Sequence, residues 1–92
     1  MNRRVEATIF GYVHGVSFRY YTQREAVCLQ LTGWVANQSD GTVKVVAEGK
    51  QNSLQELASF LLQGSPAARV DHVKVDWLDA TDEFSNFSVR HL

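Results

Sequence analysis

Apolar and polar residues alternate along the first part of the chain. From Arg4 to Phe10 every second side chain is apolar, which is typical of a β-strand with one face on a core. Gly11 ends this stretch, and a glycine-containing loop follows through Ser17. From Phe18 the spacing becomes helical, and Gly33 stands where a left-handed helix C-cap is expected. The apolar side of this helix consists of Phe18, Thr22, Ala26 and Leu29, with Cys28 and Leu31 toward its flank.

The middle of the chain predicts a β-hairpin. Two apolar segments, residues 34–37 and 42–48, flank Ser39-Asp40-Gly41. An Asp-Gly pair between two such segments is a strong hairpin signal, because the turn needs positive φ.

A second helix and two further strands follow the hairpin. Ser53 and Glu56 have the spacing of a capping box, and Gly64 with Pro66 ends the helix. Alternation returns over residues 70–78, and a short strand is expected over 87–90. The apolar side of this helix is made of Leu54, Leu57, Ala58 and Leu61.

The predicted order is therefore β-α-β-β-α-β, with a short extra strand at the end. Two helices of this length can cover only one face of a mostly antiparallel sheet. The pattern thus predicts an α+β fold, a ferredoxin-like split βαβ sandwich, and handedness rules leave few other ways to wind it. With 92 residues we expect a single domain spanning 1–92.

Composition and charge narrow the classes of partner. Nine Lys plus Arg against ten Asp plus Glu give a net charge of −1, which supplies no general field for nucleic acid or an anionic membrane. We expect neither as a partner, so any anion site must be built locally. The single cysteine, Cys28, excludes an intramolecular disulfide and a four-cysteine zinc site. No leader and no membrane-length apolar run is evident, so we expect a cytoplasmic monomer.

Spacing excludes most familiar catalytic motifs. Gly11 and Gly15 lie one residue too close for a Walker loop, and Arg19 stands where a nucleophile elbow needs glycine. A cysteine-dependent phosphatase loop would need its thiol at Val13. Cys28, inside the first helix, is more commonly a core or flanking residue than a nucleophile.

The spacing of histidines and acidic residues does not indicate a metal or cofactor site either. The three histidines, at 14, 72 and 91, show no i, i+4 pairing and no neighbouring ligands. The acidic stretch from Asp76 to Glu83 is more typical of a solvated charge run than of a metal site. We therefore expect no metal and no cofactor.

The segment from Tyr12 to Arg19 is the candidate anion site. A glycine-containing turn can form a concave nest of backbone N–H groups, and the first turn of a helix adds free N–H groups and the positive end of the dipole. Arg19 in that turn adds a planar, permanently charged fork. The alternative is a solvated surface arginine, which is more common at helix starts.

Asn37, before the hairpin, is the second candidate. Its strand shares a sheet with the first strand, so its amide could accept from and donate to a water molecule near the loop. The alternative is an asparagine that bonds its own backbone beside a turn. Thr42 is a candidate to hydrogen-bond near Asn37 and hold it.

Two separated motifs resemble the signatures of the acylphosphatase family. The first is Ile9-Phe10-Gly11-Tyr12-Val13-His14-Gly15-Val16-Ser17-Phe18-Arg19. The second is Gly33-Trp34-Val35-Ala36-Asn37 with Gly41-Thr42-Val43 and Gly49, its internal spacing intact. Later segments that are also similar are Gly64-Ser65-Pro66, Val70-Asp71 and residues 84–89. The resemblance covers essentially the whole chain.

The resemblance implies hydrolysis of the carboxyl–phosphate bond of small-molecule acyl phosphates without a metal. It implies that Arg19 binds the phosphate together with the backbone amides from Gly15 to Arg19, that is of Gly15, Val16, Ser17, Phe18 and Arg19. It also implies that Asn37 orients the attacking water. His14 stands where the family usually has glutamine. We expect either that its imidazole adds pH dependence near neutrality or that it points to solvent.

Two other functions remain open from the sequence. Ferredoxin-like sheets with exposed aromatic residues often bind single-stranded RNA by stacking, although no segment here matches the RRM signature and the overall charge does not favour RNA. The other hypothesis is an acylphosphatase-like accessory domain, of the kind fused to the large hydrogenase-maturation carbamoyltransferase.

Overall fold

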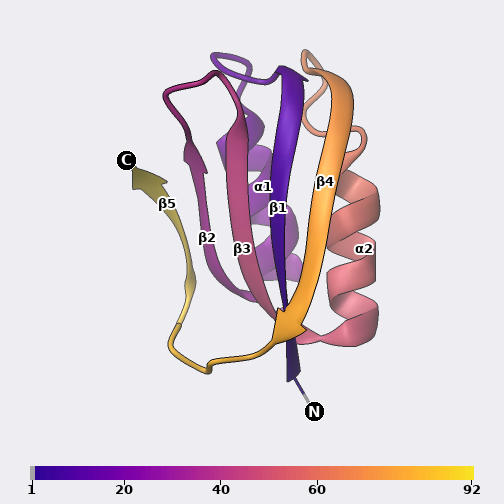
Figure 1. Cartoon of the computed structure of the whole chain (residues 1–92), viewed down its shortest axis with the longest axis vertical. Coiled ribbons are helices and arrows are strands. Elements are labelled where there is room, and N and C mark those ends of the chain that lie inside the picture. Colours follow the sequence, from indigo (N-terminus) through magenta and orange to yellow (C-terminus); the bar gives the residue numbers. More distant parts are fainter. Residues whose placement is uncertain (1) are drawn as a thin grey trace.

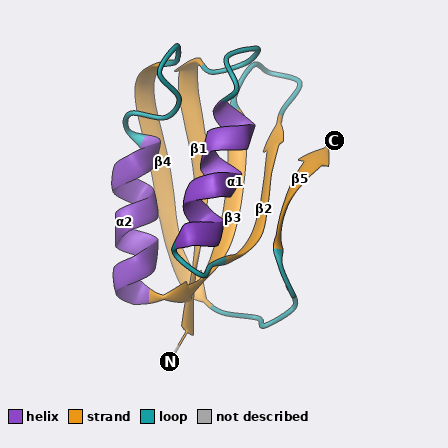
Figure 2. Cartoon of the chain, turned by 180° about the vertical axis from the view of Figure 1, so that it is seen from behind, coloured by secondary structure: helices purple, strands orange, loops and turns teal. Residues whose placement is uncertain are grey.

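The computed structural model describes residues 2–92 and has the predicted sandwich architecture (Figure 1). The strands form one sheet in the order β4-β1-β3-β2-β5, in which only the β2–β5 pair is parallel. Both helices cover the same face of this sheet, as Figure 2 shows from behind. The elements are β1 (Asn2–Tyr12), α1 (Phe18–Cys28), β2 (Thr32–Asn37), β3 (Val43–Lys50), α2 (Gln51–Leu61), β4 (Arg69–Asp79) and β5 (Phe87–His91).

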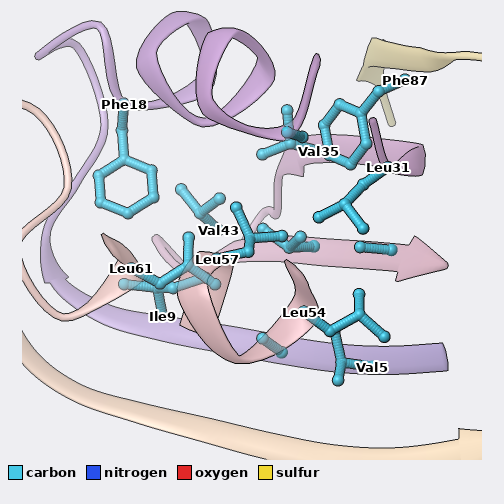
Figure 3. Close-up of a cluster of buried hydrophobic side chains, with 14 of the residues drawn as sticks. Val5, Ile9, Phe18, Leu31, Val35, Val43, Leu54, Leu57, Leu61 and Phe87 are labelled. Atoms are coloured by element: carbon cyan, nitrogen blue, oxygen red, sulfur yellow. The ribbon is translucent and has the colours of Figure 1, made fainter. Parts of the chain in front are cut away.

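The core lies between the sheet and the helices, where the predicted apolar faces meet. Alternate residues of β1 and β3 face it, and α2 contributes three leucines that are at most 1% exposed. Full burial of one such side chain stabilises the fold by about 1.5–3 kcal/mol. Phe18, the first residue of α1, belongs to the same cluster, so the start of this helix is anchored in the core (Figure 3).

Two details of α1 differ from the prediction. The helix ends at Cys28, and the left-handed residue beyond it is Gln30, with φ 60°; Gly33 is instead part of β2. The assignment of Gly33 as a C-cap was therefore wrong, because the chain turns within three residues and starts a strand. Cys28 is exposed, so it belongs to the outer flank of the helix rather than to the core.

The predicted capping box at α2 was also wrong. Lys50 is the N-cap, no side chain caps the helix, and Ser53 already lies in its first turn. The physical reason is that β3 runs directly into α2 without a connecting loop, so the helix starts two residues before Ser53. Gly11 likewise does not end β1: a register shift after Phe10 lets the strand continue to Tyr12.

A salt-bridge network covers part of the other face of the sheet. Glu48 of β3 is only 2% exposed, and one of its carboxylate oxygens lies 3.0 Å from Nη1 of Arg4 on β1. The backbone N–H groups of Thr81 and Asp82 donate to the same carboxylate at 2.9 Å each. Burial alone would raise the pKa of Glu48, but these hydrogen bonds and Arg4 outweigh it and hold that pKa below its ordinary value.

Several connections meet at one end of the sheet. The β1–α1 loop, the β2–β3 hairpin and the α2–β4 connection all lie there, and β5 ends on the same side (Figure 1). The predicted anion loop and Asn37 are thus brought to one end of the molecule. Within residues 2–92, neither helix is long and apolar enough to cross a membrane.

Candidate active site

The loop from Val13 to Ser17 turns the chain sharply between β1 and α1. Gly15 and Ser17 both have left-handed backbones, with φ of 70° and 63°. Ser17 is the N-cap of α1 but makes no side-chain capping bond, and the first helical hydrogen bond runs from Tyr21 N to Ser17 O. The preceding N–H groups are therefore left for another acceptor, which is the arrangement that binds anions at helix starts.

Two contacts from the α2–β4 connection fix this loop. The hydroxyl of Ser65, only 2% exposed, donates to the carbonyl oxygen of Val16 at 2.6 Å. The backbone of Gly64 packs against the Phe18 ring so closely that a Cβ there would lie 2.2 Å from the ring. Ser65 was missed as a site residue, because Gly64-Ser65-Pro66 was interpreted as the end of the helix and as a segment similar to the family, with no role given to the serine.

A pocket of about 470 Å³ lies beside this loop and brings the two main candidates together. Arg19 from α1 and Asn37 from β2 both line it. The remaining lining residues are Val13, Gly15, Ser17, Phe18, Tyr20, Gln23, Val89 and His91. Val16 is absent from this lining; its side chain packs against the core and its carbonyl accepts from Ser65.

Asn37 lines this pocket and carries an unused acceptor. Its side-chain oxygen Oδ1 is buried and has no hydrogen-bond partner among the described residues. The predicted alternative, in which this side chain bonds its own backbone beside the turn, is therefore not what the structure shows for Oδ1. A buried amide oxygen without a partner costs about 1–3 kcal/mol, so a molecule bound in the pocket that donates to it would recover that free energy.

Thr42 organises the hairpin rather than Asn37 itself. Its hydroxyl donates to Asp40 Oδ1 at 2.6 Å and accepts from Gln38 Nε2 at 2.9 Å. The hydrogen bonds from the Thr42 hydroxyl and backbone N–H lower the pKa of Asp40. No hydrogen bond between Thr42 and Asn37 is found in the described part of the chain, so any effect on Asn37 passes through the hairpin backbone.

His14 joins the loop to this hairpin. Its Nε2 lies 2.8 Å from the carbonyl oxygen of Thr42, and because a carbonyl only accepts, Nε2 carries the proton and donates. His14 is partly buried and does not line the pocket. It thus makes a structural link between the two segments that carry the candidate residues.

Four lining residues had no predicted role, Tyr20, Gln23, Val89 and His91, and of these Gln23 and His91 make side-chain hydrogen bonds. The parallel pairing of β5 with β2 sets His91 opposite Asn37, and Nδ1 of His91 lies 3.3 Å from Nη1 of Arg19. Gln23 donates from Nε2 to the Phe87 carbonyl at 3.2 Å and so ties α1 to β5. Gln23 follows Arg19 by one turn of α1, so helical spacing could have indicated it, whereas His91 reaches the pocket only through the pairing of β5 with β2.

Comparisons with known proteins point to one family. A family model described as Acylphosphatase matches residues 5–89. The chain is 49% identical to the acylphosphatase of Salinibacter ruber over 96% of its own length and 93% of that protein. It superimposes on the crystal structure of the Bacillus subtilis acylphosphatase with a TM-score of 0.92 and 35% identity, covering 96% of this chain and 98% of the other. A Coxiella burnetii acylphosphatase structure gives a TM-score of 0.91 at 38% identity, covering 97% and 93%.

Proposed function

The chain belongs to the acylphosphatase family and hydrolyses acyl phosphates, and we propose that it does so, without a metal ion, in the pocket between the start of α1 and the end of β2. In this proposal the phosphoryl group lies against the backbone amides from Gly15 to Arg19 and is paired with the Arg19 guanidinium. Asn37 binds the attacking water. The observation that carries the proposal is the buried, unpartnered Oδ1 of Asn37 in the same pocket as Arg19.

The reaction needs few protein groups. Water attacks the phosphorus atom while the bond from phosphorus to the carboxyl oxygen breaks, and the electron pair leaves with the carboxylate, which departs without a proton. The water proton passes to a phosphate oxygen or to solvent. The protein therefore has to position the water and balance charge on the transferring group, and these two effects dominate phosphoryl transfer.

The pocket contains groups suited to both tasks. Arg19 supplies a fork of donors with a fixed positive charge, and the free amides at the start of α1 add directed dipoles. The Asn37 side-chain amide hydrogen-bonds the water and leaves an oxygen lone pair for the attack. Because the recognised group is the phosphate, this design tolerates a range of acyl groups.

We also propose a domain organisation, an oligomeric state and a cellular compartment for the enzyme. We propose that residues 1–92 act as one acylphosphatase domain, as a monomer, in the cytoplasm, on a small-molecule substrate and without nucleic acid or a membrane as partner. The near-balanced charge and the single free cysteine support this assignment. The RNA-binding alternative predicts a salt-dependent RNA affinity, which a filter-binding titration would detect.

The direct test measures phosphate release from an aryl acyl phosphate in the presence of a chelator. The Arg19→Ala variant should lose a factor of about 10²–10³ in kcat/KM, the size expected for one charged contact to the transferring group. Arg24→Ala is the matched control, because Arg24 lies on the same helix, away from the pocket, over the Tyr21 ring. Undiminished turnover by Arg19→Ala, or turnover abolished by the chelator, would contradict the proposal.

A further inference from the structure

The strand β5 brings one more polar side chain to the pocket. Its parallel pairing with β2 aligns His91 with Asn37, and both side chains line the pocket with Arg19. Figure 2 shows β5 running toward the end of the sheet where α1 begins. Nδ1 of His91 lies 3.3 Å from Nη1 of Arg19, the one side-chain hydrogen bond of Arg19 found within residues 2–92.

The chemistry of this contact determines the protonation state of the His91 imidazole. A guanidinium is always protonated and only donates, so Nδ1 of His91 must be the acceptor and must carry no proton. The ring is therefore neutral in this arrangement, with its proton on Nε2. An imidazolium would have no acceptor for Arg19 and would place a second positive charge beside it.

We propose that His91 is a positioning residue that holds the Arg19 guanidinium at the pocket before substrate arrives. The inference rests on the proposed role of Arg19 as the phosphate ligand. Arg19 has several rotatable bonds, and fixing them during binding would weaken the affinity. A neutral His91 fixes them in advance, whereas after binding the phosphate itself holds the guanidinium. The effect of His91 is therefore on substrate affinity more than on the chemical step.

The surroundings of His91 contain few other ionisable groups. From α1 the pocket lining beside it carries Arg19 and the phenol of Tyr20, while Gln23 of α1 and Asn37 of β2 are neutral. On β5 itself Arg90 lies over the Trp34 ring, 5.1 Å from its centroid, and not in the pocket lining. Protonation of His91 would therefore act mainly on Arg19.

Two variants separate the hydrogen bond from simple packing. His91→Asn places an amide oxygen near the position of Nδ1, so it keeps an acceptor that does not titrate. His91→Phe keeps a ring of similar shape without an acceptor. At pH 8 we expect His91→Phe to raise KM for an acyl phosphate, and the inhibition constant of inorganic phosphate, by about fivefold, the size of one ordinary hydrogen bond. We expect kcat to change less than twofold and His91→Asn to match the wild type.

A sharper test is how the ratio of substrate affinities between the wild type and each variant changes with pH. The advantage of the wild type over His91→Phe should disappear as the pH falls from 8 to 5, while that of His91→Asn should persist. A wild-type advantage that stays constant or grows toward acid pH would overturn the proposal, since growth would mean that the imidazolium binds phosphate directly. A His91→Asn variant as weak as His91→Phe would also overturn it.

One readout does not depend on catalysis. The NMR order parameter of the Arg19 side-chain Nε–H should be high in the wild type and in His91→Asn at pH 8, and lower in His91→Phe. Equal values in all three proteins would refute the positioning role even if Arg19 is essential for turnover. An active Arg19→Ala variant would instead refute the proposed function, while the order parameter would still report on the Arg19–His91 contact.

Discussion

Single side chains connect the segments that form the pocket, and His14 is the clearest case. It does not line the pocket, yet its Nε2–H bond to Thr42 O ties the anion loop to the hairpin that follows Asn37. Both the neutral and the protonated ring carry a proton on Nε2, so this bond does not depend on the charge of the imidazole. One expectation from the sequence is that His14 makes the activity depend on pH. His91 is a better candidate for this effect, because it contacts Arg19 directly.

His14→Ala should lower kcat/KM by about three- to tenfold and stability by about 1 kcal/mol, because one partly buried hydrogen bond is lost and the loop loosens against the hairpin. His14→Gln should restore most of both, since its amide N–H₂ reaches the same carbonyl. Steady-state kinetics with urea unfolding would measure the two effects. His72→Ala, an exposed histidine of β4, is the control. Equal kinetics for His14→Ala and His72→Ala would exclude the linking role.

At the scale of elements, the α2–β4 connection supports the start of α1. Gly64 has φ 66° and its backbone packs directly on the ring of Phe18, whose own N–H belongs to the proposed phosphate cradle. Gly41 offers a matched comparison. It also has a left-handed backbone, φ 91°, but no atom lies within 4 Å of the place where its Cβ would be.

Gly41→Ala should therefore cost about 1–2 kcal/mol, the strain of a left-handed alanine. Gly64→Ala should cost about 2–4 kcal/mol, because the new methyl group also displaces the Phe18 ring, and it should raise KM by moving the cradle. Chemical denaturation and steady-state kinetics would measure these effects. Equal losses of stability, or an unchanged KM for Gly64→Ala, would show that the connection does not support the cradle.

The helices and strands also show which parts of the fold the sequence could predict. The order and type of the elements follow from alternation and helical spacing, and both are confirmed. The ends of the helices are not, because β3 continues straight into α2 and the α1–β2 turn uses Gln30, and neither depends on a residue type with a strong local preference.

For the site, Arg19 and Asn37 were predictable because each lies in a motif of fixed spacing, and the structure places both in one pocket. His91 and Ser65 were not, because they reach the site through strand pairing and a contact across 49 residues of sequence.

At the scale of the whole molecule, the network around Glu48 links distant parts of the chain. It joins β1, β3 and the connection before β5 on the face of the sheet away from the helices, through Arg4, Glu6, Thr81, Asp82 and Glu83. The pKa of Glu48 is lowered in the folded state, so its contribution to stability is complete above the unfolded value of about 4.3. That contribution is lost as the pH falls through the lower folded pKa.

Glu48→Gln should reduce the free energy of unfolding by about 1–3 kcal/mol at pH 7, because Arg4 and two backbone N–H groups lose a charged acceptor. Its stability should also fall less steeply than that of the wild type between pH 5 and pH 2. Glu56→Gln, exposed on α2 and without an ion pair among the described residues, is the control. Parallel acid profiles for wild type and Glu48→Gln would contradict this account.

At the scale of the whole molecule the net charge is close to zero, so an anion has to be recognised by the groups of one pocket. In the proposed function Arg19 and the backbone amides bind the phosphate while Asn37 holds the water. The most direct measurement is kcat of Asn37→Ala on an acyl phosphate at saturating substrate. We expect kcat to fall by about 10²–10³-fold with KM and the fold preserved, because the variant still binds phosphate but no longer orients the nucleophile. A kcat within a few-fold of the wild type would contradict it.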